Sequence, residues 1–274
     1  MFTATSLLFV PGSRPERFAK ALAAGAGLAV IDLEDAVAED DKQAAREAAI
    51  ASVDGNQGDF AIRLNSVATA AGVADLGMLA SVAHLPVVLL VPMVEDPRDL
   101  EIIAGVLGPR CPALVPLIET PRALRKALAI AQAPMVAAVM FGGGDFAAEL
   151  GVRLAWEPLL AARQQLLLAC AEANVPAIDV PFVNLEDETG LAEECARAKA
   201  IGFAAKAAIH PAQIGPIITA FAPSEKEVNE AAEALRAYEE GGERAIRYKG
   251  RMLEAPLVKH YRAVLAQAKD SANA

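Results

Sequence analysis

The sequence predicts an α/β fold, a parallel (β/α)8 barrel followed by a C-terminal helical extension. Short runs rich in Val, Ile and Leu recur along the chain, and each precedes a polar break and a stretch with helical spacing. Eight such runs occur before residue 210, and the alternation then stops. The chain has 274 residues, and one barrel needs about 250, so a single barrel and a short tail fit.

The expected strands are short and mostly apolar. A doubly wound open sheet gives the same alternation of strands and helices, so it stays open as an alternative. The Gly-rich stretches do not read GxGxxG after the first strand, which favours the barrel. The eight strands are expected at Leu7–Val10, Leu28–Asp32, Phe60–Leu64, Val87–Val91, Leu114–Ile118, Val136–Phe141, Ala177–Val180 and Ala204–Ile209.

Helical stretches separate these strands, and their high Ala content suits close packing. After the last strand, residues 222–238 read as a charged amphipathic helix, Gly241 and Gly242 break the chain, and an arm over 243–269 carries its own helix. We expect a barrel domain at residues 1–222 and a helical arm at 223–274, which caps its own barrel or contacts an adjacent subunit. Helices of the barrel are expected at Pro15–Ala24, Lys42–Ser52, Pro97–Leu107, Arg122–Ala131, Glu157–Ala173 and Thr189–Ile201.

Composition excludes several classes of partner. Lys and Arg number 25 against 35 Asp and Glu, and the net charge of -10 argues against nucleic acid or an anionic membrane as the main partner. No apolar run is long enough to cross a bilayer. Cys111, Cys170 and Cys195 form no CxxC pair, so reduced, buried thiols are expected. The first residues lack the features of a secretory signal, which favours a cytoplasmic location.

Two carboxylates follow consecutive strands. In a parallel barrel the carboxyl ends of the strands converge on one mouth, where chemistry is placed. Glu119 and Asp145 stand 26 residues apart, about one βα unit. Two carboxylates with water and a chelating substrate suit Mg²⁺. Alternatively, Glu119 caps the following helix and Asp145 pairs with a nearby Arg.

Basic residues stand at two other strand ends. Arg63 ends an apolar strand, and its planar fork suits a carboxylate ligand or an internal salt bridge. Arg14, Arg17 and Lys20 surround the start of the first helix, where backbone N–H groups and basic side chains favour phosphate. A solvated helix face explains the same cluster.

Two further features have both functional and structural interpretations. Gly142, Gly143 and Gly144 precede Asp145, and they either let a ligand approach the backbone or form a tight turn. Lys206 lies in the last strand, where a Schiff-base lysine is possible. Nothing nearby in the sequence would lower its pKa, which favours an ion pair within the barrel.

Seven strings of the sequence together carry a resemblance to a known family. The strings are LLFVPGSRPERFAKAL, VIDLEDAV, RLN, LIETPRAL, FGGGDFAAELG, GFAAKAAIHPAQI and PSEKEV. They resemble the citrate lyase β-subunit family, within the HpcH/HpaI aldolase/citrate lyase superfamily of citramalyl-CoA and malyl-CoA lyases. The resemblance runs in order from Leu7 to about Pro256.

The resemblance implies a fold, an assembly and a reaction. It implies a TIM barrel, a homotrimer or hexamer, and cleavage of a carbon–carbon bond in a short 3-hydroxyacyl-CoA. The expected reaction converts citramalyl-CoA to acetyl-CoA and pyruvate, or citryl-CoA to acetyl-CoA and oxaloacetate. The alternatives are a malyl-CoA lyase or thioesterase, and a CoA-thioester-binding accessory protein with weak catalysis.

The resemblance also implies roles for single residues. Mg²⁺ would be held by Glu119 and Asp145, with Arg63 on the keto-acid fragment. Glu34 and Asp35 would lie beside the metal-bound waters. The CoA thioester would meet four further residues, namely Arg14, Lys20, Gly143 and Gly144.

The proposed chemistry needs an acid/base as well as a cation. Cleavage passes through an alkoxide and a thioester enolate, so a divalent ion and a fixed cation both stabilise it. A separate acid/base exchanges a proton with the acetyl-CoA methyl carbon. In the resembled lyases this group is the Asp of a C-terminal MIDxP motif from an adjacent subunit. Here the stretch reads RMLEAP, so Glu254 stands in its place. The extra methylene shifts the carboxylate by about 1 Å, and such a shift can cost about 100-fold in rate.

Overall fold

The computed structural model describes residues 2–55 and 59–273. Residues 1, 56–58 and 274 belong to the expected domains but lie outside the described residues. The chain divides into two compact units, residues 1–218 and 219–274. Each unit is described by itself.

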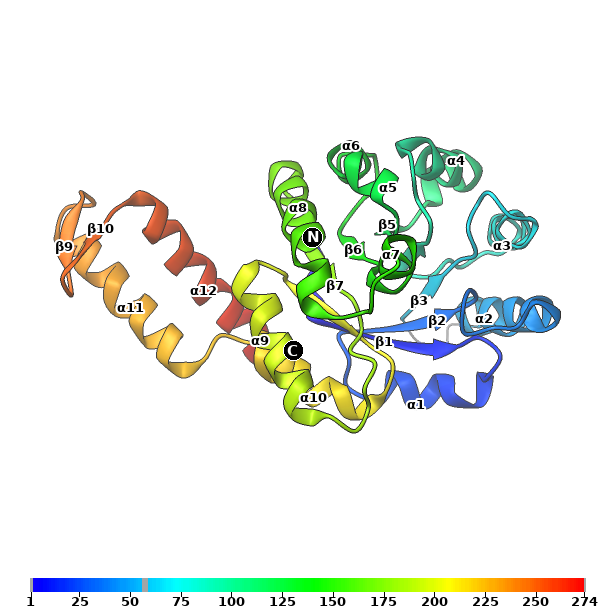
Figure 1. Cartoon of the computed structure of the whole chain (residues 1–274), viewed down its shortest axis with the longest axis horizontal. Helices are drawn as coiled ribbons and strands as arrows, with labels where there is room; N and C mark the ends of the chain where they lie inside the picture. Colours follow the sequence, from blue (N-terminus) through cyan, green and yellow to red (C-terminus); the bar gives the residue numbers. More distant parts are fainter. Residues whose placement is uncertain (1, 56–58, 274) are drawn as a thin grey trace. The chain divides into compact units, whose positions relative to one another are not determined.

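The first unit is a closed barrel of parallel strands, in which each strand pairs with the next and β8 pairs with β1 (Figure 1). The expected TIM barrel is therefore confirmed, and the doubly wound alternative is wrong. Each strand agrees with its expected position, although β6 is shorter because Val136 makes only an isolated bridge to Leu114. The strands are β1 (Ser6–Pro11), β2 (Leu28–Asp32), β3 (Phe60–Arg63), β4 (Val88–Val91), β5 (Ala113–Ile118), β6 (Val139–Phe141), β7 (Ala177–Asp179) and β8 (Ala205–Ala208).

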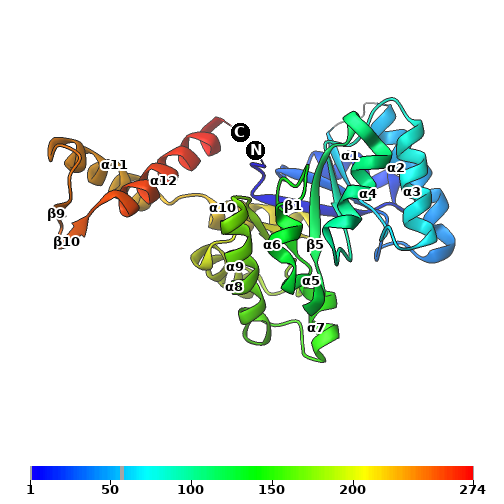
Figure 2. The ribbon, with the colours of Figure 1, turned by 90° about the horizontal axis from the view of Figure 1, so that it is seen from above.

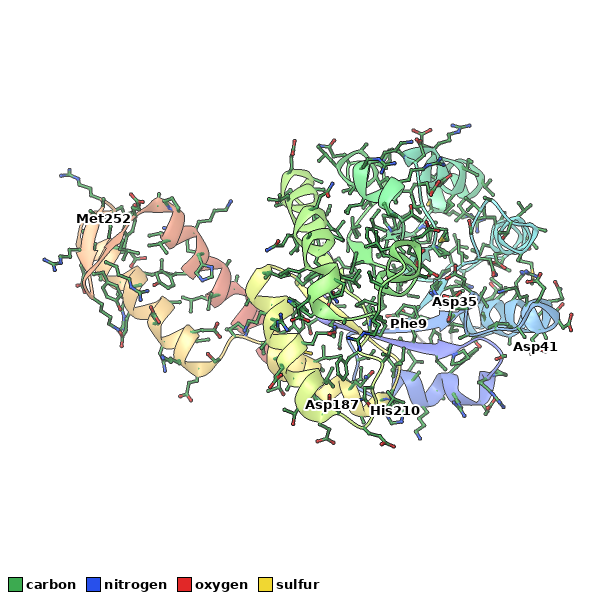
Figure 3. The ribbon with its side chains drawn as sticks, viewed as in Figure 1. Phe9, Asp35, Asp41, Asp187, His210 and Met252 are labelled. Carbon is green, nitrogen blue, oxygen red and sulfur yellow. The ribbon has the colours of Figure 1, made fainter. Side chains whose placement is uncertain are left out.

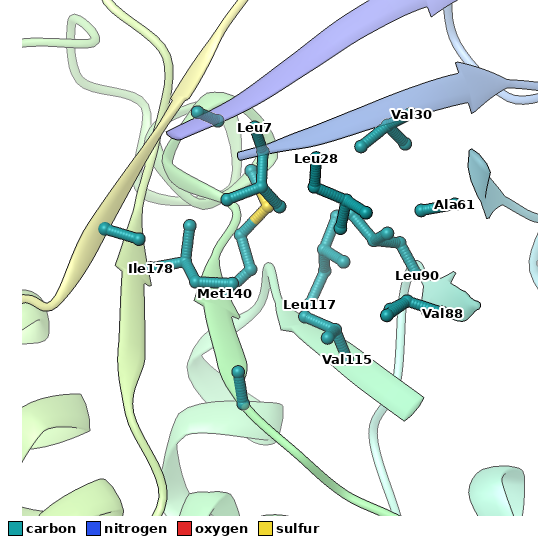
Figure 4. Close-up of a cluster of buried hydrophobic side chains, with 13 residues drawn as sticks. Leu7, Leu28, Val30, Ala61, Val88, Leu90, Val115, Leu117, Met140 and Ile178 are labelled. Carbon is teal, nitrogen blue, oxygen red and sulfur yellow. The ribbon is translucent and has the colours of Figure 1, made fainter. Parts of the chain in front are cut away.

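The barrel interior is filled by alternate residues of the strands. Val30, Ala61, Leu117 and Met140 belong to one buried apolar cluster with their neighbours from the other strands (Figure 4). Side chains two residues apart lie on the same face of a strand. The next inward positions after these four residues are therefore Asp32, Arg63, Glu119 and Gly142. Three of these positions carry polar side chains, so the apolar core of the barrel gives way to a polar layer at the carboxyl ends of the strands.

Helices cover the outside of the barrel. The expected helix over 122–131 is broken at Lys126, whose backbone leaves the helical region at φ −107° and ψ 6°. The first expected helix begins as a short 3-10 helix. The described elements are η1 (Pro15–Arg17), α1 (Phe18–Leu22), η2 (Glu39–Asp41), α2 (Lys42–Asp54), α3 (Ala70–Ser81), α4 (Pro97–Leu107), η3 (Gly108–Arg110), α5 (Pro121–Arg125), α6 (Ala127–Ala131), α7 (Gly143–Leu150), α8 (Trp156–Ala173), α9 (Glu188–Ile201), η4 (Pro211–Gln213) and α10 (Ile214–Phe221).

Lys206 lies between the sheet and the helices. Its neighbours Ala205 and Ala207 belong to the interior cluster, so Lys206 points outward, away from the barrel interior. Its Nζ donates to Asp179 Oδ2 and Glu194 Oε1, both at 2.7 Å. Burial opposes the charge on Lys206, but these two carboxylates raise its pKa above the ordinary value. The ion pair expected from the sequence is present.

The second unit is a helical hairpin with a small sheet. It contains α11 (Glu225–Glu240), β9 (Ile246–Tyr248), β10 (Arg251–Leu253) and α12 (Ala255–Asn273). α11 and α12 lie side by side (Figure 2), and β9 pairs with β10 in antiparallel register. Ser224 caps α11 with a capping box, in which its side chain and that of Glu227 each accept from the other's backbone N–H. Among the described residues, no helix is long and apolar enough to cross a membrane. The cytoplasmic location stays a prediction.

Candidate active site

Glu119 follows β5 and is almost completely buried. Its side chain is 2% exposed, and its Oε2 accepts a hydrogen bond of 2.5 Å from the backbone N–H of Met93. Met93 has φ +52°, in the left-handed region that non-glycine residues rarely adopt. The cap of α5 is Thr120, whose Oγ1 accepts from the N–H of Ala123. The alternative in which Glu119 caps this helix is therefore wrong.

Gly142 leaves the space that Glu119 occupies. A Cβ built at Gly142 would lie 2.1 Å from Cγ of Glu119, which is far inside van der Waals contact. The next residues, Gly143 and Gly144, begin α7 instead of forming a loop, and Asp145 lies in the first turn of this helix. Asp145 makes no ion pair with any described residue, so the alternative Arg partner is absent there.

Replacement of Gly142 by Ala is expected to displace the Glu119 carboxylate without breaking the barrel. Because Glu119 Cγ and Oε1 occupy the added methyl's position, the carboxyl group has to move. We expect the Mg²⁺ dissociation constant to rise by about tenfold or more, as for other changes beside metal ligands. Gly144→Ala is the matched control, because a Cβ there meets nothing within 4 Å. Equal Mg²⁺ affinities for the two variants, measured by isothermal titration calorimetry, would contradict the steric argument.

Arg63 is held by a carboxylate that the sequence analysis did not assign to the site. Its Nε donates to Asp32 Oδ1 at 2.7 Å, and its Nη2 donates to Asp32 Oδ2 at 2.6 Å. This bidentate pair fixes the plane of the guanidinium group. The group also lies 5.3 Å from the ring centroid of Phe9. Burial opposes the charge, but the hydrogen bonds and charge of Asp32 raise the pKa of Arg63 above its ordinary value.

Glu34 and Asp35 lie on the other side of the same guanidinium group. Arg63 Nη1 is 2.8 Å from Glu34 Oε2 and donates to Asp35 Oδ2 at 3.2 Å. Figure 3 shows Asp35 and Phe9 near the ends of the first two strands. Asp32 orders the segment that carries both acids, because its carboxylate accepts from the N–H groups of Glu34 and Ala36.

The mouth of the barrel therefore holds more carboxyl groups than basic side chains. Burial raises the pKa of Glu119 to about 7 and that of Glu34 to about 9. Burial and the charge of Asp35 also raise the pKa of Asp145 above its ordinary value. Glu34 Oε2 is buried without a hydrogen bond of good geometry, despite its short distance to Arg63. Burial is the largest cause of all three shifts, and the neighbouring carboxyl groups add to it.

The raised pKa values predict a pH-dependent metal affinity. A carboxylate has to lose its proton to bind a cation, so protons compete with Mg²⁺ below about pH 7, the pKa of Glu119. We expect Mg²⁺ affinity to rise by about tenfold per pH unit up to neutrality and then to level off. The same shift has an opposite effect on folding, because ionisation of a buried carboxyl destabilises the metal-free protein as pH rises from 4.5 to 7.

Titration calorimetry at pH 6 and pH 8 measures the affinity, and thermal unfolding with EDTA measures the stability. An affinity that does not change between these pH values would contradict the assigned role of the Glu119 proton.

The donor set suits a hard cation that keeps its water. The described residues contain no group of three or more His, Cys, Asp or Glu that would form a full protein cage. Mg²⁺ needs only one or two protein carboxylates and retains several waters. Glu119 and Asp145 are the carboxyl groups in the mouth that no described basic side chain pairs with directly.

Other expected site residues are spread more widely. Arg14 and Lys20 are exposed, near η1 and in α1. Gly143 is buried and Gly144 is exposed in the first turn of α7. Glu254 belongs to the second unit, where it is exposed between β10 and α12. The structure thus brings Arg63, Glu34, Asp35, Glu119 and Asp145 together, as the electrostatic coupling among them indicates.

Sequence reasoning missed three contributors to the site. The sequence analysis places Asp32 only at the end of an expected strand, although period-two alternation from Val30 puts its side chain on the inward face. By the same alternation, the side chain of Phe9 lies on the same inward face of its strand as that of Leu7. The N–H of Met93 has no sequence signal, because its direction depends on a left-handed backbone at a non-glycine residue.

A model of the HpcH/HpaI aldolase/citrate lyase family matches residues 5–211, which is more than half of the chain. The chain belongs to this family. The HpcH/HpaI match covers all the strands of the barrel, from β1 to β8, and it includes the five acids and the arginine of the mouth.

Relatives and solved structures resemble the chain over nearly its full length. The mitochondrial citramalyl-CoA lyase of Homo sapiens is 30% identical, over 93% of this chain and 82% of its own. A (3S)-malyl-CoA thioesterase of Cereibacter sphaeroides is 32% identical, over 96% of this chain and 94% of its own. The crystal structure of CitE from Mycobacterium tuberculosis with magnesium, acetoacetate and coenzyme A has a TM-score of 0.85 and 32% identity, and covers 97% of this chain and 98% of its own.

Proposed function

We propose that this protein is a Mg²⁺-dependent lyase that cleaves citramalyl-CoA to acetyl-CoA and pyruvate. The observation that carries the proposal is the mouth of the barrel. There, two carboxyl groups without a direct basic partner follow the neighbouring strands β5 and β6, and one fixed guanidinium stands at the end of β3. Similarity to citramalyl-CoA lyases and to a CitE structure with magnesium and coenzyme A supports the choice of reaction. Citryl-CoA, which would give acetyl-CoA and oxaloacetate, is the other substrate of this class.

Glu119 and Asp145 would hold the magnesium ion. When bound, Mg²⁺ supplies a Lewis acid that stabilises negative charge on the oxygens of the keto-acid fragment. Burial, with a smaller contribution from neighbouring acids, raises the pKa of both carboxyl groups, and a bound cation would favour their ionised forms. Glu34 and Asp35 would accept hydrogen bonds from water beside them.

Arg63 would bind the carboxylate of the keto acid. Its hydrogen bonds to Asp32 and Asp35 use three of its N–H groups, and a guanidinium has five. The remaining N–H groups of Nη1 and Nη2 can donate to an anion in the mouth. Because Asp32 fixes the plane of the group, little ordering is needed when substrate binds.

A second carboxylate would exchange the proton at carbon. During cleavage the C3 hydroxyl gives up its proton to a base in the mouth, and its oxygen becomes the carbonyl of the keto acid as the C2–C3 bond breaks. The electrons of that bond pass to the thioester as an enolate, whose C2 takes up a proton and becomes the methyl group of acetyl-CoA. We assign this exchange to Glu254 from an adjacent copy of the chain, and therefore propose a homo-oligomer, a trimer or hexamer. Arg14 and Lys20, together with the backbone at Gly143 and Gly144, would meet the CoA moiety.

Direct assay of the purified chain tests the proposed function. Citramalyl-CoA, citryl-CoA and malyl-CoA are each incubated with Mg²⁺, and acetyl-CoA and the keto acid are quantified. We expect equimolar acetyl-CoA and pyruvate from citramalyl-CoA, and loss of both with EDTA. Release of acetyl-CoA from none of the three substrates would refute the lyase assignment.

Thioester hydrolysis of malyl-CoA is a second candidate reaction. It is favoured by the 32% identity to a (3S)-malyl-CoA thioesterase over nearly the full length of both chains. The same mouth could hold the smaller glyoxylate in place of pyruvate. Product analysis separates the two, because hydrolysis yields free malate and CoA without acetyl-CoA.

Variants of Glu254 distinguish an efficient lyase from a CoA-thioester-binding protein with weak catalysis. If the extra methylene misplaces the carboxylate, Glu254→Asp should raise turnover by about 10- to 100-fold and Glu254→Gln should change little. If Glu254 already works well, Glu254→Gln should lower turnover by about 100-fold or more, the usual contribution of a general acid or base. Steady-state turnover with each variant decides between the two.

A further inference from the structure

The loop after β4 contacts the end of β5 at two neighbouring points. The N–H of Met93 donates to Oε2 of Glu119, and Thr120 Oγ1 donates to Oε1 of Glu95 at 3.1 Å. These two contacts join residues 93 and 95 to residues 119 and 120. They continue the pairing of β4 with β5 beyond the last ladder position, Val91 with Pro116.

Glu95 is the side chain that ties this loop to β5 and α5. Its Oε2 also accepts from Arg122 Nη1 at 2.9 Å, so both carboxylate oxygens are engaged by residues that follow Glu119. Thr120 is 5% exposed, and its hydroxyl is fixed further because it caps α5. The contact of Glu95 with Thr120 is therefore partly removed from water, unlike its contact with Arg122, whose side chain is 66% exposed.

The loop also needs an external constraint because its backbone is strained. The left-handed region is unfavourable for a non-glycine residue such as Met93, and this conformation persists only where its surroundings enforce it. Val94, the residue after Met93, is 1% exposed and fixes one side of the loop. On the other side, the N–H groups of Glu95 and Asp96 donate to Asp99 at the start of α4.

We infer that Glu95 is a positioning residue, which holds Met93 so that its N–H binds Oε2 of Glu119 and leaves Oε1 free for a cation. The inference rests on the proposed function, in which Glu119 is a Mg²⁺ ligand. A ligand oxygen whose partner is lost becomes free to rotate, and loss of such outer contacts typically weakens metal binding by about 10- to 100-fold. The hydrogen bond from Met93 also favours the ionised carboxylate that a cation needs.

The test measures Mg²⁺ affinity by titration calorimetry on the full chain, without substrate. Glu95→Ala is expected to raise the dissociation constant by about tenfold or more. Glu95→Gln keeps an oxygen that can accept from Thr120, so its Mg²⁺ dissociation constant should stay within about threefold of the parent value. If Glu95 acted only through its negative charge, this variant would bind Mg²⁺ as weakly as Glu95→Ala. Glu101→Gln on α4, an exposed carboxylate paired with Arg98, is the matched control and should bind as the parent does.

A second pair of variants tests the backbone directly. Met93→Gly permits the left-handed conformation, whereas Met93→Val disfavours it. We expect the Val variant to bind Mg²⁺ at least fivefold more weakly than the Gly variant. The inference would be overturned if Glu95→Ala bound Mg²⁺ as tightly as Glu95→Gln and Met93→Val as tightly as Met93→Gly. Lower melting temperatures without a change in Mg²⁺ affinity would show that these residues have only a structural role. Absence of Mg²⁺ binding by the parent chain would refute the proposed metal site itself, and this inference with it.

Discussion

Replacement of Glu119 by Gln is expected to abolish Mg²⁺-dependent cleavage while leaving the barrel folded. The amide keeps an oxygen for the N–H of Met93, but it loses the charge that a divalent cation requires. We expect kcat/KM to fall by at least about 10³-fold, or about 4 kcal/mol of transition-state stabilisation. Steady-state assay at saturating Mg²⁺ measures this loss.

The stability of this variant provides an internal check. Burial disfavours the ionised form of Glu119, so removal of its charge should leave the metal-free protein at least as stable at pH 8. Glu157→Gln, which removes an exposed carboxylate that pairs with Arg197 outside the mouth, is the control and should keep full activity. Parental activity and metal dependence in Glu119→Gln would remove this residue from the ligand set.

Replacement of Arg63 by Lys should have the second large effect. An ammonium group retains the positive charge but cannot make two parallel hydrogen bonds to Asp32 and also reach Asp35. We expect kcat/KM to fall by about 10²- to 10³-fold, because the group that binds the keto acid is no longer fixed in one plane.

Arg46→Lys is the matched control for this change. Arg46 is 3% exposed and pairs with Asp75 at 2.6 Å, where α2 packs beside α3. Its replacement should lower the melting temperature but leave the kcat/KM of the folded protein unchanged. If Arg63→Lys loses no more activity than Arg46→Lys, Arg63 acts only in folding and the substrate contact is wrong.

The positions of strands and helices are predictable where the sequence marks both the element and its boundary. Leu28–Asp32 is an apolar run that spans the whole of β2, and α4 begins at Pro97 after the capping residue Asp96. The break at Lys126 had no such signal, because its helical pattern continues on both sides. The β9–β10 hairpin was also missed, since its strands have only three residues each.

The sequence predicts those site residues that stand at the ends of strands or on the inward face of a strand. Glu119 and Asp145 follow consecutive strands, and the family resemblance, confirmed by the match over residues 5–211, added Glu34 and Asp35. α7 was not predicted, because three successive glycines are typical of loops. In the structure a side chain larger than that of glycine has no room at position 142, because Glu119 fills the space beside it. This contact joins the ends of two strands, and no local sequence pattern encodes it.

A crystal structure with Mg²⁺ and pyruvate is the most direct test of the central claim, that Glu119 and Asp145 together hold one cation. The account predicts a single octahedral ion with one oxygen of each carboxylate at about 2.0–2.1 Å, the pyruvate carboxylate toward Arg63, and water in the remaining positions. An ion bound elsewhere, or density in which the two carboxylates point away from each other without an ion, would contradict it.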